Sequence, residues 1–271
     1  MSAHASPWAA LRAWAALLYV FILGPILITA AVSFNATNRS FFPPQGFSLR
    51  WWGEVFRPQW LQPFVFSLEL AALTALVATA IGVPLAFAFQ RHEFPGKALV
   101  RTVTLGPLIL PTLVTGIALL QFLTLAGLGS WLGFWALLIG HVIICLPFSV
   151  RTVAISLQAM PGRVESAAAS LGAPPAAVLR HVTLPLVMPG VFAGLTFAFI
   201  HSFADVNLSL FVARPGERPV TVAILAFLEF GFAPTLAALS MLTLIVPLAL
   251  IAILGRFVGL GDFLYQEQGR G

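Results

Sequence analysis

The chain has 271 residues, of which 59% are hydrophobic and only 8% are charged, and its formal net charge is +5 at pH 7. A soluble domain carries about 25% charged residues, so this composition excludes a water-soluble globular protein and places the chain in a lipid bilayer. The basic residues are scattered in short loops between apolar blocks, which favours membrane orientation over nucleic-acid binding as their explanation. The single cysteine, Cys145, excludes a disulfide within the chain and a cysteine metal cluster.

Apolar blocks of roughly 20 residues, the length needed to cross a bilayer, recur along the chain and predict an all-α membrane protein with six transmembrane helices. They cover residues 13–33, 64–89, 102–127, 134–150, 186–203 and 236–258. The first block is too long for the core of a signal peptide, so we expect it to remain as a membrane span. The third block contains Pro107 and Pro111, which predict a kink or break near its start.

Two stretches between the blocks are expected to lie on the outer side. Residues 34–63 hold Trp51, Trp52 and Trp60 and are expected to form a loop with an interfacial helix, because tryptophan favours the membrane–water boundary. Residues 205–234 are expected to form a partly re-entrant outer loop.

In the fifth block, Gly190-Val-Phe-Ala-Gly194 is a GxxxG pattern that would let another helix approach closely.

The Lys and Arg residues of the loops predict which side of the membrane each end of the chain occupies. Of the 14 such residues, nine lie on one side of the predicted spans and five on the other. This bias places both termini, and the loop at 160–185, in the cytoplasm. We divide the sequence into a first helix with its outer loop (1–63), a transmembrane core (64–258) and a short cytoplasmic tail (259–271).

Residues 160–185 form the longest stretch without an apolar core that lies between two apolar blocks. Pro161 stands at a plausible first position of a helix, and Glu165 falls in its first turn, where the helix dipole favours a negative charge. Gly172 can end that helix in a left-handed conformation, and the two prolines that follow prevent its continuation. A second short helix, 176–181, is expected to lead into the fifth block.

The first helix of this loop has one small apolar face. Its residues recur at the i, i+3, i+4, i+7 spacing that lines one side of a helix. They are Val164, Ala167, Ala168 and Leu171. The pattern predicts that this face is presented to a partner outside the lipid.

The spacing in this loop resembles the EAA loop of type I ABC-importer permeases, which reads E-A-A, three residues, Gly, nine residues, Ile, one residue, Leu-Pro. Here Ala167–Ala168, Gly172 and Val182-Thr183-Leu184-Pro185 stand at the matching positions. The acid of the pattern would fall at Ser166, whereas this chain has Glu165 one residue earlier. The resemblance implies that the loop couples the chain to a cytoplasmic ATPase. The residues expected in this role are Val164, Glu165, Ser166, Ala167, Ala168, Leu171, Gly172, Leu184 and Pro185.

Three further segments resemble permeases of the spermidine/putrescine type: residues 105–116, residues 141–148 and Ser202-Phe-Ala-Asp-Val206. In those permeases the fifth span ends in S-F-D-D or a close variant. Here Ala204 replaces the first of the two acids and leaves Asp205 alone. Related permeases for ferric iron or aminoethylphosphonate share much of the framework, so these cargoes stay as alternatives to a polyamine.

Acidic residues at the ends of the spans are candidates for the solute path, because an ionisable group at membrane depth is costly. Asp205 directly follows the fifth block, and Ser202 and Asn207 add hydrogen-bonding groups beside it, so we expect this carboxylate to meet a cationic solute. Glu69, in the second block, is a further candidate for the path. For Glu69 and Glu229, however, an interfacial carboxylate that reaches water is the favoured interpretation.

The sequence contains no recognisable catalytic or ATP-binding motif. The GxxxxGK[ST] pattern of a phosphate-binding loop is absent, as are H-E-x-x-H and G-x-S-x-G. The histidines lie far apart, and His141 in the fourth block is expected to form interhelical hydrogen bonds rather than to bind a metal. An intramembrane enzyme would need paired catalytic groups, and a passive channel would not need an EAA loop, so both are weaker alternatives.

Taken together, the resemblance implies a permease subunit of a binding-protein-dependent ABC importer in the bacterial inner membrane. The expected partners are a second permease subunit, two cytoplasmic ATPase subunits that bind the ATP, and a periplasmic solute-binding protein. The expected cargo is a polyamine. We expect no cofactor, metal or nucleic acid to bind, and no covalent reaction to be catalysed by the subunit itself.

Overall fold

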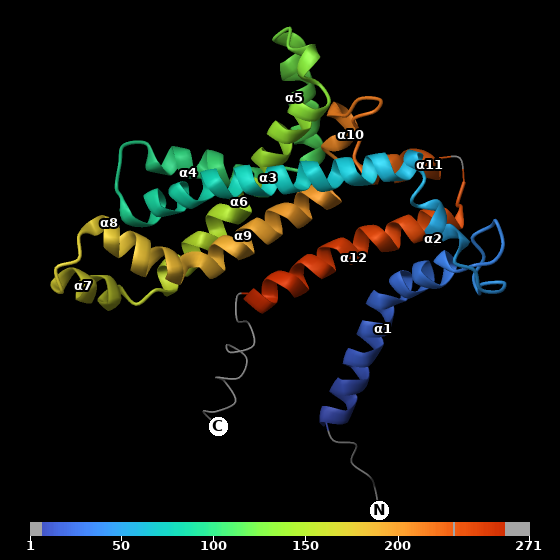
Figure 1. The fold of residues 1–271 in the computed structure, drawn as a ribbon, viewed down its shortest axis with the longest axis horizontal. Coiled ribbons are helices and arrows are strands. Elements are labelled where there is room, and N and C mark those ends of the chain that lie inside the picture. Colours follow the sequence, from blue (N-terminus) through green and yellow to red (C-terminus); the bar gives the residue numbers. More distant parts are fainter. Residues whose placement is uncertain (1–6, 230, 258–271) are drawn as a thin grey trace, which may run out of the picture. The chain divides into compact units, whose positions relative to one another are not determined.

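A computed structural model describes residues 7–229 and 231–257, which form helices joined by loops (Figure 1). The long helices are α1 (Pro7–Ser33), α3 (Pro58–Arg91), α6 (Phe134–Ala159), α9 (Leu184–Ala204) and α12 (Pro234–Phe257). The shorter ones are α2 (Arg50–Glu54), α4 (Lys97–Leu105), η1 (Gly106–Leu108), α5 (Thr112–Leu125), η2 (Gly129–Trp131), α7 (Gly162–Ser170), α8 (Pro175–Val178), η3 (Leu179–Thr183), α10 (Ser209–Val212) and α11 (Val220–Leu228). Between the described residues, β-pairing is limited to isolated bridges, and the predicted all-α class is confirmed.

The chain folds as two compact units. Unit one contains Met1–Leu61 and Ile224–Val246, and unit two contains Gln62–Ala223 and Pro247–Gly271. The residues expected in ATPase coupling and in the solute path all belong to unit two. The predicted cytoplasmic tail, 259–271, lies outside the described residues.

Five described helices are long and apolar enough to cross a membrane, and a bent pair can make a sixth span. The bent pair joins Lys97–Leu108 to Thr112–Leu125 at an angle of 111°. α5 has 14 residues and is therefore about 21 Å long, too short alone for a hydrocarbon core of about 30 Å. The bend confirms the predicted break, because Pro107 and Pro111 lie at it and neither can donate a backbone hydrogen bond.

The fifth span differs from the prediction at its start. α8, η3 and α9 form one continuous apolar helix from Pro175 to Ala204, so the separate short helix predicted at 176–181 is wrong. Pro185, the last residue of the predicted loop, lacks a backbone N–H and yet lies inside this helix. The π-helical segment η3 precedes it, and its wider turn changes the hydrogen-bond register so that the helix continues through the proline.

α6 and α9 lie side by side and form the main helix pair of unit two (Figure 1). Gly190 and Gly194 are buried on α9, and a Cβ added at Gly194 would lie 2.9 Å from the Cα of Ser149 on α6. A Cβ at Gly82 on α3 would lie 2.7 Å from the Ser149 Cβ. The GxxxG pattern therefore allows a close helix approach, as predicted, and Ser149 lies where α3, α6 and α9 meet.

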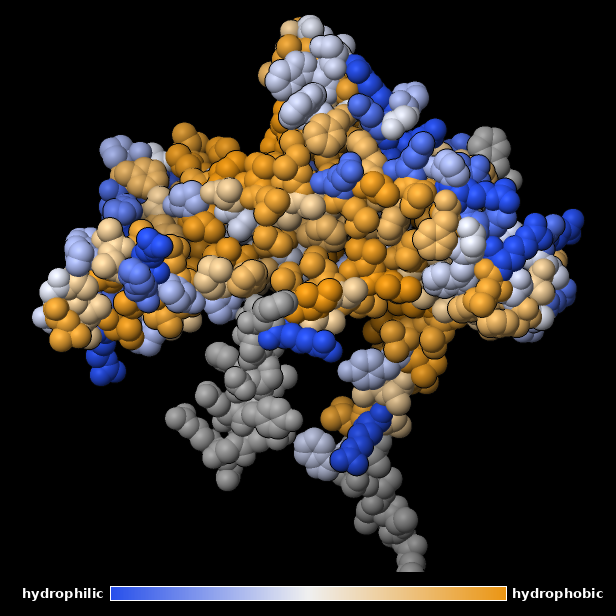
Figure 2. Space-filling view, in the orientation of Figure 1, coloured by the Kyte–Doolittle hydropathy of each residue, from blue (hydrophilic) through white to orange (hydrophobic). Residues whose placement is uncertain are grey.

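Apolar side chains remain on the outside of these helices. Leu76 on α3, Ile155 on α6 and Phe197 on α9 are all exposed. Figure 2 shows apolar residues over much of the drawn surface of the helices, and hydrophilic residues near α7. Such a surface suits lipid or an apolar partner and not water.

In unit one, the loop that follows α1 is ordered by its own contacts. The side-chain oxygen of Asn35 accepts hydrogen bonds from the backbone N–H groups of Thr37 and Gln45, and its backbone carbonyl accepts one from Trp51 Nε1 at 2.6 Å. Trp51 and Trp60 are buried and a short helix, α2, forms within the loop, while the position of this loop at the membrane–water boundary stays a prediction. The two tryptophan rings fill the interior of the unit, where burial of a large aromatic surface is favourable.

Candidate functional site

The first helix of the predicted coupling loop is α7, and it presents its apolar face to the outside. No residue of α7 is buried. Val164 is exposed, and Leu171, which caps the helix, is 89% exposed. Gly172 has a φ of 84°, which confirms the predicted left-handed end of the helix, a conformation that glycine adopts without strain.

Glu165 lies in the first turn of α7, as predicted, but its side chain turns inward. Its Oε1 accepts a hydrogen bond from Arg91 Nη2 at 2.7 Å, and a second from the Thr183 hydroxyl. Burial alone would raise the pKa of Glu165, but the hydrogen bonds from Thr183 and Arg91 and the charge of Arg91 outweigh it and lower the pKa from its ordinary value. We call Arg91, Glu165 and Thr183 the Glu165 cluster.

The Glu165 cluster forms part of the wall of a cleft of about 360 Å³ between α7 and the helix formed by α8 and η3. Ala169, Ala173 and Val178 supply apolar wall, while Ser166 is at the exposed edge and donates its hydroxyl to the Gly162 carbonyl at 3.3 Å. The side chain at position 166 therefore points differently from that of Glu165. Leu184 and Pro185, also expected in the coupling loop, lie in the first turn of α9.

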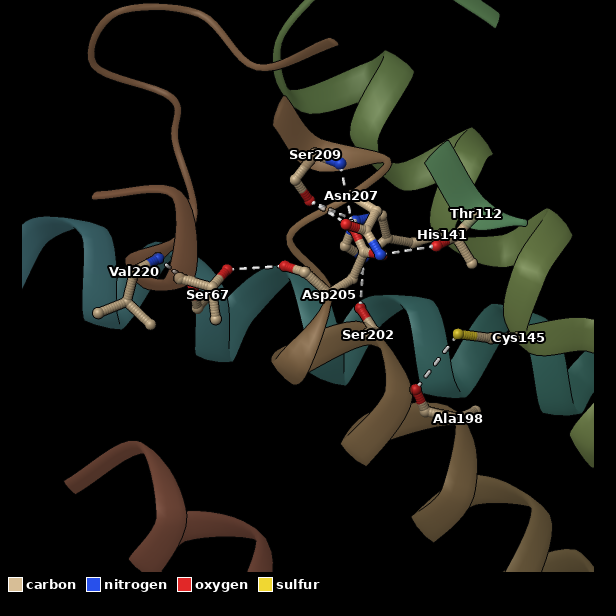
Figure 3. Close-up of polar contacts among 11 residues, drawn as sticks. Ser67, Thr112, His141, Cys145, Ala198, Ser202, Asp205, Asn207, Ser209 and Val220 are labelled. Atoms are coloured by element: carbon tan, nitrogen blue, oxygen red, sulfur yellow. Dashed lines mark hydrogen bonds and ion pairs between the residues drawn. The ribbon is translucent and has the colours of Figure 1, made fainter. Parts of the chain in front are cut away.

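A second polar group lies at the other end of α9, where α6, α9 and α10 meet (Figure 3). His141 is fully buried on α6; its Nδ1 is 2.7 Å from Ser202 Oγ, and its Nε2 is 2.9 Å from Ser209 Oγ. This geometry confirms the prediction that His141 forms interhelical hydrogen bonds. We call His141, Ser202, Asp205 and Ser209 the buried polar cluster.

Asp205 completes the buried polar cluster and is only 7% exposed. Its Oδ2 accepts hydrogen bonds from the backbone N–H and the hydroxyl of Ser209, each at 3.0 Å, and lies 3.7 Å from His141 Nε2. The backbone carbonyl of Asp205 accepts a hydrogen bond from Thr221 Oγ1 at 2.7 Å. The carboxylate thus holds the start of α10 against the end of α9.

The neighbours of Asp205 occupy a different environment. Ala204, the position of the missing acid, is exposed, and so is Asn207. The Asn207 Nδ2 donates to the hydroxyl of Thr112, the first residue of α5, at 3.3 Å. In Figure 3 this pair lies beside the buried polar cluster. Asn207 and Thr112 are therefore neutral polar groups at this end of α9, whereas the Asp205 carboxylate is buried.

The other acidic candidates are exposed. Glu69 is exposed on α3, and Glu229, in unit one, is exposed after α11. Among the described residues, no group of three or more His, Cys, Asp and Glu side chains is arranged to hold a metal ion. Cys145 is buried, with its sulfur 3.4 Å from the Ala198 carbonyl.

Some members of both clusters were not predicted from the sequence. Arg91 is one of the 14 basic residues that predict the orientation, and Thr183 is one residue of the loop pattern, and neither was expected to meet Glu165. Arg91 is 74 positions from Glu165, and no local pattern links them. Ser209 could have been found, because it follows Asp205 by four residues, the distance of one helical turn.

Comparisons with known proteins agree with this architecture. Residues 78–260 match the family model described as "Binding-protein-dependent transport system inner membrane component". The chain is 35% identical over 235 residues to the spermidine/putrescine transport system permease protein PotC of Escherichia coli K12, covering 86% of this chain and 88% of PotC. It is 30% identical over 232 residues to the putrescine transport system permease protein PotI of the same strain, covering 83% and 82%.

The fold is also similar to that of a solved membrane transporter. A chain of a bacterial ABC transporter involved in the import of the acidic polysaccharide alginate superposes with a TM-score of 0.70, at 14% identity, covering 93% of this chain and 94% of that one. The family match spans most of the transmembrane core and includes both clusters. The chain therefore belongs to the family of inner membrane components of binding-protein-dependent transport systems.

Proposed function

We propose that this chain forms part of the solute path of a polyamine importer. We further propose that α7 transmits movements of separate ATPase subunits to that path. The observation that carries the proposal is the exposed small apolar face of α7, ended by Gly172 in a left-handed conformation. An exposed apolar face of this kind is suited to a groove on another protein. Because α8, η3 and α9 are continuous, a displacement beside α7 can pass directly into a membrane span.

The proposed assembly contains a second permease subunit, two cytoplasmic ATPase subunits and a periplasmic solute-binding protein. ATP is bound by the ATPase subunits, so this chain needs no cofactor and catalyses no covalent reaction. Closure of the ATPase subunits would move the loop at 160–185, and the helices of the core at 64–258 would respond largely as rigid bodies. Such rocking of packed helices is a known route to alternating access.

We propose that both termini and α7 lie in the cytoplasm, as the distribution of Lys and Arg predicts. Reporter fusions test this topology directly. We expect a cytoplasmic signal for a reporter placed after Arg163 and a periplasmic signal for reporters near Gln45 and Gly216. A periplasmic signal after Arg163 would refute both the orientation and the ATPase-binding role of α7.

The proposed cargo is a polyamine, because relatives named for spermidine/putrescine and putrescine transport match over most of the chain. Asp205 is the proposed source of negative charge at the path, and the exposed Asn207 and Thr112 supply neutral hydrogen-bonding groups in front of it. Ser202 positions the cluster through His141. One carboxylate behind neutral groups would attract an ammonium ion without holding it tightly, which suits a site that must release its cargo.

Transport into reconstituted vesicles tests the cargo and the path together. The permease pair, ATPase and binding protein would be assayed with spermidine, putrescine, Fe³⁺ and aminoethylphosphonate. We expect polyamine uptake, and we expect Asp205→Asn to reduce it because the variant keeps the shape but loses the charge. Asn207→Asp, which adds a negative charge at the exposed neighbouring position, is the matched control and should not reduce polyamine uptake. Uptake of the phosphonate or iron alone would refute the polyamine proposal, and full polyamine uptake by Asp205→Asn would refute the role of Asp205.

A further inference from the structure

We propose that the Glu165 cluster fastens α7 to two membrane spans at once, which makes Arg91 and Thr183 positioning residues for the coupling of ATP hydrolysis to transport. This inference rests on the proposed role of α7 in binding the ATPase. It differs from that role because the cluster acts within this chain, through a side chain that turns inward and contacts Arg91 and Thr183. Glu165, one position before the acid expected from the EAA pattern, is the centre of the link.

The cluster joins three elements through one carboxylate oxygen. Arg91 is in the last turn of α3, and its guanidinium also lies over the Phe87 ring at 5.3 Å. Thr183 is the last residue of η3 and is only 1% exposed. Both donate to Glu165 Oε1. A movement of α7 that displaces this oxygen therefore pulls on the ends of the second and the fifth spans together.

Apolar packing does not hold α7 in place, because none of its residues is buried. Directional hydrogen bonds to Glu165 are then the contacts best able to set the orientation of the helix. A second ion pair, in the connection that follows α3, shows the contrast with the Glu165 cluster. Lys97 pairs with Glu93 at 2.7 Å, four residues apart in the same connection, so that ion pair links no separate elements.

Thr183 lies in the one part of the fifth span, among the described residues, that is π-helical. η3 is a π-helical segment within an otherwise α-helical span. Such segments are rare and occur mostly at functional positions, where the wider turn lets a helix change its hydrogen-bond register. The Thr183 hydroxyl also donates to the carbonyl of Val178, the residue just before this segment, at 3.4 Å. A force on Thr183 therefore acts on the part of the fifth span whose backbone hydrogen bonds can change register.

The decisive experiment measures solute transported per ATP hydrolysed in the reconstituted complex, together with the amount of ATPase that co-purifies. Arg91→Gln and Thr183→Val should retain the ATPase and lower the transport ratio by roughly 2- to 30-fold, the range seen for changes in coupling networks. The charge swap Arg91→Glu with Glu165→Arg should restore much of the ratio. Glu93→Gln, which breaks the neighbouring ion pair, is the matched control and should leave the ratio unchanged.

Two results would overturn the inference. One is a transport ratio in Arg91→Gln equal to that of Glu93→Gln. The other is loss of ATPase co-purification in Arg91→Gln and Thr183→Val, since that would make the cluster a part of the docking surface or of the fold. Failure of the unmodified chain to retain an ATPase would instead refute the proposed function itself, so the two failures are distinguishable.

A distance measurement provides a second readout that does not depend on transport. Spin labels on the exposed residues His92 and Ser170, in a chain whose buried Cys145 is replaced by alanine, report the separation of α3 and α7. We expect a narrow distance distribution in this background and a broader one after Arg91→Gln. An equally narrow distribution after Arg91→Gln would show that the cluster does not position α7.

Discussion

The buried polar cluster and the Glu165 cluster both join segments that are distant in sequence, but they differ in exposure. The side chains of His141 and Asp205 are 0% and 3% exposed, whereas those of Arg91 and Glu165 are 33% and 24% exposed. Where water is excluded, a polar group without a partner costs free energy, so the buried polar cluster favours one arrangement. The Glu165 cluster lies closer to water, where an ion pair contributes less than about 1 kcal/mol, so it can orient α7 with little effect on the stability of the fold.

The difference assigns a separate task to each end of α9. At one end, hydrogen bonds among α6, α9 and α10 hold the segment that follows the fifth span in a fixed position. At the other end, a charged link connects α7, the proposed docking helix, to two spans. A transporter needs both, because a displacement at the loop changes the path only if the helix between them is held at defined points.

The largest expected effect follows from removing the centre of the buried polar cluster. His141→Leu leaves the Ser202 hydroxyl without its partner at a cost of about 1–3 kcal/mol, and it also removes one partner of Ser209. We expect a clear drop in the thermal midpoint in detergent. His92→Phe, at an exposed histidine, is the control and should change stability by less than about 0.5 kcal/mol. Equal midpoints for the two variants would show that the cluster does not stabilise the fold.

The next effect concerns the end of α7. Gly172→Val forces a β-branched residue into a left-handed conformation that costs about 1–2 kcal/mol. We expect this variant, and Ala168→Asp at the half-buried edge of the apolar face, to lose ATPase association while still inserting in the membrane. Gly162→Ala is the matched control, because an added Cβ there meets no atom within 4 Å. Full ATPase co-purification with Gly172→Val would contradict the docking role of α7.

The smallest expected effect is on stability at the Glu165 cluster. Arg91→Gln should change the free energy of unfolding by less than about 1 kcal/mol, the usual range for ion pairs open to water. Its effect on transport, in contrast, should be much larger than that of any control. A destabilisation comparable to that of His141→Leu would remove the distinction between the two clusters.

The pH dependence of the Glu165 cluster sharpens the same comparison. The pKa of Glu165 is lowered, so its ion pair contributes above the ordinary carboxyl pKa and is lost only as the pH falls through the lowered value. We therefore expect no change in transport from this group between about pH 6 and pH 8. A loss of coupling in that range that disappears in Glu165→Gln would contradict the assigned direction of the shift.

Much of the fold could be predicted from local patterns. Apolar length indicated the spans, Pro107 and Pro111 indicated the bend before α5, and Gly172 indicated the left-handed end of α7. The same reasoning failed at Pro185, where a π-helical turn carries the helix through a proline. It failed because a proline only removes a local hydrogen bond, while the surrounding helix can redistribute the others.

By itself, the sequence determined the membrane class, the order of the helices, the fixed spacing of the loop at 160–185 and the family to which these patterns belong. These features depend on hydropathy and on interactions between residues within a few turns of one another. The tertiary structure alone decided that Glu165 meets Arg91 and that Asp205 turns inward to Ser209 and His141. Those pairings depend on how α3, α6 and α9 pack, and helix packing follows from side-chain shape over distances that no local pattern records.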